Sequence, residues 1–189
     1  MVEAFAVAAD LGKMLNRTFA PGEETDWIDE LLANASTYLR GVIGQDVFPQ
    51  TTSEFVAYPD GGRVDLPQYP IVSVDSVERD GVPVDFTYRP GYITLDSDDP
   101  ADVTFTWGLT VAPDELKRLA CVLVSQVMLP IEAGLGLTAG GLSSAALDDF
   151  KLAWADAGAS SGMVLTPIAI ASVQKQFGRG GSTVMETVR

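Results

Sequence analysis

Apolar residues recur at helical spacing in two long stretches of the chain, and the first of these is residues 23–43. Three acidic residues crowd its expected first turn, where a helix N-terminus favours negative charge, and Gly44 stands where glycine commonly ends a helix. The apolar positions follow at steps of three, one, three, four and three: Ile28, Leu31, Leu32, Ala35, Leu39 and Val42. Because these steps place all six on one face, the pattern predicts a helix over residues 23–43.

The second stretch, residues 113–129, is apolar on nearly every side. Pro113 suits the first helical position, and no charged residue stands between Arg118 and Glu132. Six apolar residues form the main stripe of this helix: Leu116, Leu119, Ala120, Leu123, Val124 and Val127. Four further apolar residues lie off this stripe: Cys121, Val122, Met128 and Leu129. A helix of this kind is expected to be buried on both sides. We therefore predict a core on one face and a neighbouring subunit on the other, with these interface residues: Leu119, Val122, Met128 and Leu129.

Two weaker patterns predict short helices. Residues 3–15 are rich in alanine, with apolar residues near helical spacing, although Gly12 costs about 1 kcal/mol in a helix interior. Residues 145–157 predict a weak helix that carries three large apolar side chains: Leu147, Phe150 and Trp154.

A last helix is predicted near the C-terminus. Thr166 is a plausible cap, Pro167 a plausible first position, and Gly178 the expected end. Glycine-rich connections are predicted at residues 134–141 and 158–162. The remaining residues are rich in Gly, Ser and Thr and end in a short β-prone piece.

Between residues 51 and 107 the pattern changes to short β-prone runs separated by turn signals such as Asp60-Gly61-Gly62, Asp80-Gly81 and Pro90-Gly91. Strands are predicted at residues 53–58, 63–66, 72–77, 84–88, 92–95 and 103–107. The run 63–66 is expected to return from the turn at residues 60–62. Together these patterns predict an α+β fold: a helical bundle with a short-stranded antiparallel β insertion at about 51–108 and an extended C-terminal arm. Residues 1–162 would form the body, and residues 163–189 the C-terminal helix and arm.

Composition and charge narrow the class of protein. The chain has 189 residues and one cysteine, so an internal disulfide is impossible and a reducing compartment fits best. Its net charge of −14 predicts repulsion from nucleic acid and from anionic membranes. Acidic residues near the N-terminus argue against a signal peptide, and the apolar run 119–131 is too short for a bilayer span. Residues 163–189, at +3 − 1 = +2, are the only part that is not acidic.

The sequence contains few residues or motifs that would support catalysis or the binding of a metal or nucleotide. The chain has no histidine, which removes the commonest general base and the usual zinc ligand. The loose G-x-G-x-x-A match at residues 134–139 follows a helix instead of a strand, and no phosphate-binding loop is present. The carboxylates of residues 96–102 lack the glycine of an EF-hand loop, so a solvated turn is favoured, with adventitious divalent binding as the alternative. Asp148 and Asp149 are interpreted as surface charge.

The two remaining residue types of interest also favour structural roles. Cys121 has no histidine to activate it and is interpreted as a buried thiol. The three tryptophans are scattered over different elements and favour packing over a ligand cage. We therefore expect no catalytic, cofactor or metal site and no enzyme activity. A hydrolase using a pair of carboxylates stays open, because no pair is singled out.

The order of these features resembles a known family. The features are the helix segment 31–41 ending in Ile43-Gly44-Gln45, the run 70–77, Asp80-Gly81, Trp107-Gly108 and the helix start at Pro113. This order is similar to that in the head–tail connector (adaptor, or head-completion) proteins of tailed bacteriophages, particularly those of actinobacterial phages. The resemblance covers residues 5–130 well and is looser beyond them.

The resemblance implies a structural virion protein of the neck, present in the host cytoplasm during assembly. It implies a ring under the portal, a dodecamer if it matches portal symmetry, with the tail-side neck or stopper protein as a further partner. DNA would pass through the lumen without specific binding. It implies no membrane, no cofactor and no active site. The alternatives are another neck protein, such as a stopper or tail-completion protein, or a soluble ligand-binding module or hydrolase.

Three hypotheses follow for this role. The two long helices would form the core and the subunit contacts, and the acidic body would let DNA slide without adhering. The C-terminal segment would dock on the portal, as an extended strand that adds to a sheet edge. The candidate residues of this portal-docking arm are Lys175, Phe177, Arg179, Val184, Met185 and Val188.

Overall fold

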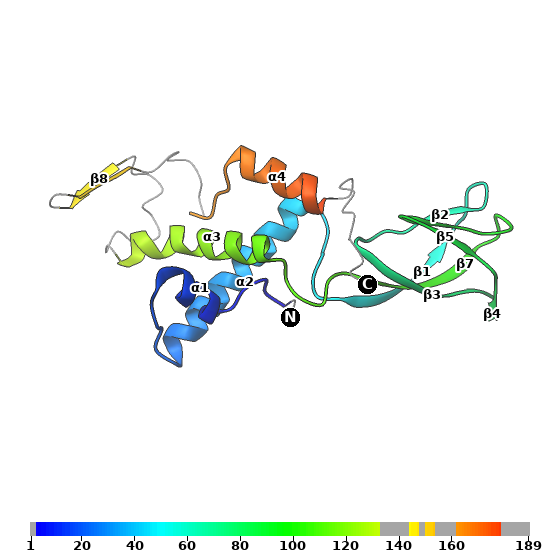
Figure 1. Ribbon diagram of the computed structural model, residues 1–189, viewed down its shortest axis with the longest axis horizontal. Coiled ribbons are helices and arrows are strands. Elements are labelled where there is room, and N and C mark those ends of the chain that lie inside the picture. Colours follow the sequence, from blue (N-terminus) through cyan, green and yellow to red (C-terminus); the bar gives the residue numbers. More distant parts are fainter. Residues whose placement is uncertain (1–2, 133–143, 148–149, 154–161, 179–189) are drawn as a thin grey trace, which may run out of the picture. The chain divides into compact units, whose positions relative to one another are not determined.

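The computed structural model describes residues 3–132, 144–147, 150–153 and 162–178, and the side chains of residues 3–128 and 162–178 (Figure 1). The described residues have the predicted α+β fold, with four helices and short antiparallel strands. They divide into two compact units. Unit 1 comprises Met1–Leu39 and Asp114–Ala171, and unit 2 comprises Arg40–Pro113 and Ser172–Arg189.

Unit 1 is built on three helices: α1 (Ala8–Leu15), most of α2 (Glu23–Ile43), and α3 (Asp114–Glu132). The predicted apolar stripe of α2 supplies core residues, and so does α3. The largest fully buried side chains of this unit are Phe5, Leu11, Ile28, Leu32, Leu39, Leu116 and Leu123. The predictions of helices over residues 23–43 and 113–129 are therefore confirmed. Gly44 has a φ of +76°, and its N–H donates to the carbonyl of Arg40, so it ends α2 as expected.

The first helix begins later than the pattern of residues 3–15 indicated. Helix α1 starts at Ala8, because the backbone ahead of it bonds to side chains instead of to itself. The N–H of Phe5 donates to Ser36 Oγ at 2.9 Å, and that of Ala8 donates to Asp29 Oδ1 at 2.8 Å. Both acceptors lie on α2, so the extended segment is held against that helix.

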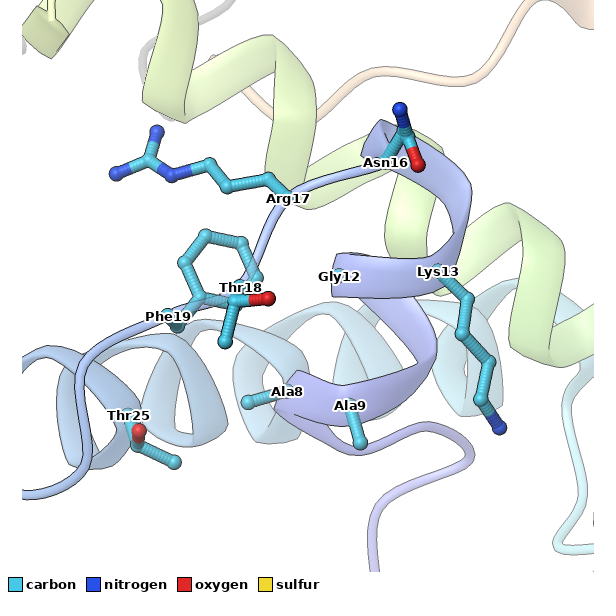
Figure 2. Close-up of a pocket in the computed structure, with 9 residues that line it drawn as sticks. All are labelled: Ala8, Ala9, Gly12, Lys13, Asn16, Arg17, Thr18, Phe19 and Thr25. Carbon is cyan, nitrogen blue, oxygen red and sulfur yellow. The ribbon is translucent and has the colours of Figure 1, made fainter.

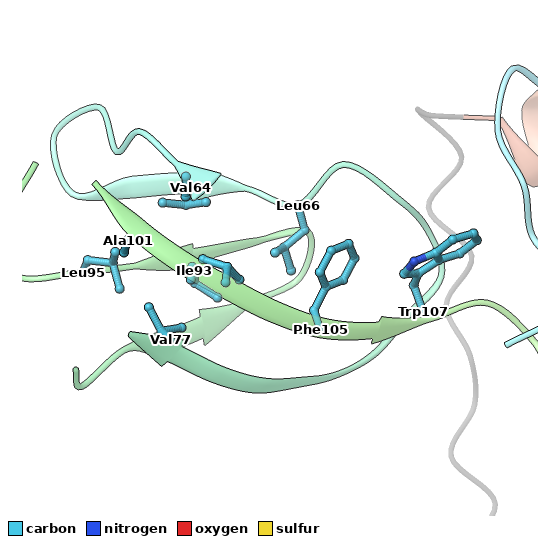
Figure 3. Close-up of a cluster of buried hydrophobic side chains, with 10 residues drawn as sticks. Val64, Leu66, Val77, Ile93, Leu95, Ala101, Phe105 and Trp107 are labelled. Atoms are coloured by element: carbon cyan, nitrogen blue, oxygen red, sulfur yellow. The ribbon is translucent and has the colours of Figure 1, made fainter. Parts of the chain in front are cut away.

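Unit 2 contains two antiparallel sheets. The larger has the order β1 (Thr51–Ala57), β7 (Ala101–Trp107), β3 (Ile71–Arg79), β4 (Val82–Pro83), and the smaller has the order β2 (Arg63–Asp65), β6 (Tyr92–Thr94), β5 (Thr87–Arg89). Apolar side chains of both sheets pack into one core (Figure 3). Strand β7 alternates between buried and half-buried residues, which matches the alternation of apolar and polar side chains in its sequence.

Residues 63–66 return from the turn at residues 60–62 as predicted, with an antiparallel bridge between Asp60 and Arg63. Their strand, β2, pairs with β6, and Val64 and Leu66 turn inward to the shared core. One strand prediction needs correction. Of the predicted strand 84–88, residues 84–86 lie in no strand and residues 87–88 belong to β5. The tight hairpin on β3 through Asp80-Gly81 is closed ahead of them by β4.

The region predicted as a weak helix at residues 145–157 contains two short strands. Strand β8 (Ser144–Leu147) pairs with β9 (Phe150–Ala153), so the helix prediction is wrong here. A dozen residues without caps have little helical stability of their own, and antiparallel pairing satisfies the same backbone groups. The predictions for residues 134–141, 148–149 and 158–161 and for Trp154 lie outside the described residues.

The last helix is confirmed as α4 (Pro167–Phe177). Thr166 caps it, because its Oγ1 accepts the N–H of Ala169 at 3.2 Å. The N–H of Gly178 donates to the carbonyl of Gln174 and closes the last turn. The predicted arm beyond Gly178 lies outside the described residues.

Candidate functional site

Helix α3 was predicted to present apolar residues to both a core and a partner. The structure buries Leu119 and Met128, which are 6% and 2% exposed within the single chain. Val122 is half-buried, and position 129 follows it by two helical turns, although the side chain of Leu129 lies outside the described residues. The half-exposed face of α3 thus runs along these residues: Glu115, Arg118, Val122, Ser125 and Gln126. Of the four predicted interface residues, Val122 is the described one with accessible surface.

Part of α3 is covered by the chain's own C-terminal segment. The carboxamide of Gln126 bonds to the backbone of Val164 in both directions, with its Nε2 donating at 3.2 Å and its Oε1 accepting at 3.1 Å. Met163 and Leu165, on either side, are 9% and 5% exposed. This packing lies within unit 1 and supplies cover that was expected from a neighbouring subunit.

The end of helix α4 is anchored in unit 2. The side chain of Gln45, which is 8% exposed, donates from Nε2 to the carbonyl of Phe177 at 2.5 Å and accepts the N–H of Tyr69 at Oε1 at 3.2 Å. Gln174 Nε2 donates to the carbonyl of Val42 at 3.0 Å, and Val173 is fully buried. The point at which the predicted arm begins is therefore fixed.

Two candidate arm residues fall within the described chain, and the structure separates their environments. Lys175 is exposed, whereas Phe177 is half-buried at the anchored end of α4. The other four candidates lie outside the described residues: Arg179, Val184, Met185 and Val188. Gln45 was not singled out as a candidate, and no sequence signal distinguishes it, since a glutamine after a helix-ending glycine is ordinarily solvated.

Five aspartates of unit 2 lie in loops at one end of the larger sheet. The register pairs Ala57 with Ala101 and Glu78 with Asp102, so the loops after β1, after β3 and before β7 share that end. These loops carry five aspartates: Asp60, Asp80, Asp96, Asp98 and Asp99. They are used in turn structure, in line with the predicted solvated turn.

Individual contacts show this structural use. Asp98 Oδ1 accepts the N–H of Gly62 at 2.6 Å, and Asp96 Oδ1 accepts from Arg79 at 2.9 Å. The hydrogen bond from Arg79, together with its charge, lowers the pKa of Asp96. Within the described part of the chain, no three metal-binding side chains come together.

A polar chain crosses the exposed face of the larger sheet. Asp75 Oδ1 accepts from Ser73 Oγ at 2.6 Å, and Asp75 Oδ2 accepts from Thr106 Oγ1 at 2.7 Å. These two hydroxyls, Ser73 first, lower the pKa of Asp75. Because Thr106 uses its proton on Asp75, Thr52 is the donor in the 2.9 Å contact between the two threonine hydroxyls. This chain ties β3, β7 and β1 together.

An open hollow of about 520 Å³ lies at α1 and the loop that follows it. Its two cationic side chains, Lys13 and Arg17, extend in different directions (Figure 2) and do not converge on one position. Arg17 donates to Glu24 Oε1 at 2.7 Å and lies over the ring of Phe19. The hollow brings together no nucleophile and base, so its geometry favours loop packing over chemistry.

Cys121 is 1% exposed, as predicted for a buried thiol. Burial, with a smaller effect of Asp10, raises its pKa to about 11, which keeps it as an unreactive thiol. Among the residues that the structure describes, no helix combines the length and apolar character that a bilayer span requires.

Comparison with known proteins finds solved structures with a similar fold, but it does not assign the chain to a family. No protein-family model and no curated protein matches the sequence. The chain is similar to a chain in the solved "Neck of empty GTA particle computed with C6 symmetry", with 19% identity over 67% of this chain and 79% of that one and a TM-score of 0.48. It is also similar to a chain in the "Virion of native gene transfer agent (GTA) particle", with 17% identity over 94% of this chain and 92% of that one and a TM-score of 0.55. The chain therefore shares the fold of a protein present in that virion structure.

Proposed function

We propose that this chain is a structural virion protein: a head–tail adaptor that forms a ring between the portal and the tail-side neck proteins and encloses the DNA channel. The observation that supports this most is the fold shared with a chain of the gene transfer agent virion along nearly the whole length of both. That solved structure is an assembled particle. The order of sequence features, which resembles phage head–tail connectors, points the same way.

Self-association would use the half-exposed face of α3. Val122 is the apolar residue on that face whose side chain is described, and Glu115 and Arg118 flank it with opposite charges. A ring requires one patch to contact a different patch on the next copy. We propose that this face is one of the two patches, with Leu129 continuing it.

The C-terminal arm would dock on the portal. Because the end of α4 is anchored through Gln45, the docking segment would begin after Gly178. Lys175 and Arg179 would then provide positive charge near an acidic partner, and the apolar residues of the β-prone end would supply the contact: Val184, Met185 and Val188.

The acidic character of the chain would serve the DNA passage. Residues 40–113 contain 12 acidic and 4 basic residues, so this stretch carries 4 − 12 = −8. Carboxylates repel phosphates, and at physiological salt this repulsion reaches about 8 Å. It therefore acts where side chains line the channel, and it keeps DNA mobile there.

The test is ring formation by the purified chain, alone and with a portal ring, measured by light scattering and negative-stain microscopy. We expect rings of about twelve copies. Val122→Asp should block them and leave a folded monomer, whereas Val82→Asp is the control, because Val82 is 63% exposed in a β-hairpin. Met128→Asp is unsuitable, since it would bury a carboxylate within the subunit. A wild-type chain that stays monomeric with the portal would refute the adaptor role; intact rings of Val122→Asp would refute the interface.

A further inference from the structure

The outer edge of strand β1 lacks the features that usually protect an edge strand. Strand β1 pairs with β7 on one side and, within the described residues, has no strand on the other. It runs for seven residues without proline, without a basic residue and without a break in register, and Glu54 is its only charge. Such an edge is a template for an added strand, because its outward N–H and C=O groups need partners.

The other sheet edges are protected or too short. Strand β4 has two residues and includes Pro83, which has no N–H to donate. Strand β2 has three residues, two of which are charged, and β5 has three, ending at Arg89. Val56, at 53% exposed, and Tyr58, at 77%, leave apolar surface beside β1. Strands β8 and β9 of the third described sheet have four residues each. Strand β1, with seven residues and one charge, is thus the longest outer strand of the described sheets.

The anchored end of α4 brings the C-terminal segment within reach of this edge. Gln45 holds the carbonyl of Phe177, and β1 begins six residues after Gln45, at most about 20 Å of extended chain. Residues 178–182 span about 17 Å when extended. Both features belong to unit 2. The reach of residues 178–182 is therefore comparable to the largest possible separation between Gln45 and the start of β1.

Residues 183–188, Thr-Val-Met-Glu-Thr-Val, contain four β-branched residues, one methionine and one glutamate, with no proline or glycine, a composition that favours a strand. We propose that in the free subunit residues 183–188 pair with the outer edge of β1 of the same chain, and so extend the larger sheet to five strands. A tether this short gives an effective concentration on the order of millimolar, which favours the chain's own edge over that of another copy.

This pairing goes beyond the adaptor role and holds whether or not the chain builds a ring. It would cover the apolar surface at Val56 and remove an edge that invites aggregation. The pairing and the proposed docking of the arm on a portal are then alternatives for the same segment. The free subunit would hold its docking strand on itself until a portal sheet replaces β1.

Hydrogen exchange of the β1 peptide measures this pairing directly. The outward amides of residues 52–57 should exchange at least tenfold more slowly in the full chain than in a chain lacking residues 179–189. Met185→Pro should exchange like the truncated chain, because proline removes a donor and disrupts a strand. Gly180→Pro, which places proline outside the pairing segment, should exchange like the full chain. Equal exchange of the full and truncated chains would overturn the proposal.

A mixing experiment identifies which copy supplies the strand. A truncated chain labelled with nitrogen-15 is mixed with an excess of unlabelled full chain, and exchange of its β1 peptide is followed by mass. If the strand comes from the same chain, the labelled β1 stays unprotected. Protection of the labelled β1 would show that a second copy supplies the strand, and would overturn pairing within one chain.

Discussion

Replacing Gln45 by alanine tests the anchor of helix α4. Gln45 is 8% exposed, and both ends of its carboxamide are used: Nε2 donates to the carbonyl of Phe177, and Oε1 accepts the N–H of Tyr69. Gln45→Ala removes both bonds at once. It leaves a backbone acceptor on α4 and a backbone donor in the loop before β3, each in a half-buried setting.

The expected loss follows from these two bonds. A hydrogen bond contributes about 1 kcal/mol net, so two contribute about 2 kcal/mol. The groups left behind add a further penalty where water cannot reach them, and the half-burial of Phe177 and Tyr69 limits this to about 1 kcal/mol. We expect the free energy of unfolding to fall by about 2–3 kcal/mol. Gln50→Ala, the same truncation at an exposed position, should change it by less than about 0.5 kcal/mol.

Urea unfolding monitored by circular dichroism gives the two free energies, and hydrogen exchange over residues 167–178 reports whether α4 is released. A loss for Gln45→Ala no larger than that for Gln50→Ala would refute the anchor. Gln45→Leu separates the two physical causes, because leucine keeps the bulk and loses the bonds. If Gln45→Leu restored full stability, packing would be the cause of the loss instead of hydrogen bonding.

Two further predictions concern unit 2. Gly62→Ala should lower the free energy of unfolding by at least about 2 kcal/mol, because its Cβ would lie 2.5 Å from a backbone carbonyl oxygen. Gly61 has a similar positive φ but open space around it, so Gly61→Ala should cost about 1 kcal/mol. Urea unfolding measures both changes. The lowered pKa of Asp75 means that its contacts stabilise the fold above about pH 4 and are lost as the pH falls through the folded-state pKa. In a carboxyl NMR titration, Ser73→Ala should raise the midpoint of Asp75 more than Thr106→Val does; equal midpoints in all three chains would contradict this.

The long helices were predictable because their signals are local. The stripe of residues 23–43 and the glycine after it determine both the period and the end of α2, and the structure agrees at each point. The pairing of strands is not local. Residues 84–88 were predicted as one strand, but residues 84–86 lie in no strand, although Val84 and Phe86 pack against the core that both sheets share. A sequence pattern predicts that a side chain is buried, but it does not predict which sheet the backbone of that residue joins.

The candidate functional surfaces likewise divide into those that a local sequence pattern predicts and those that depend on the folded structure. Val122 was selected from its place on the helix, and its half-exposed position fits that selection. The anchor at Gln45 was out of reach, since it joins residues 132 positions apart through a side chain whose type carries no signal. The open edge of β1 was out of reach as well, because an edge exists only once the strand order is known.

The size of any subunit contact on α3 follows from what already covers the helix. An apolar surface on every side was first taken to require a second subunit. Residues 163–165 supply much of the cover instead, since Gln126 holds the backbone of Val164 and the residues on either side are buried. Among the side chains that the structure describes, α3 keeps a half-exposed face that includes Val122. A ring contact restricted to this face would be small for a permanent interface, so a stable ring would need a second contacting surface on each subunit.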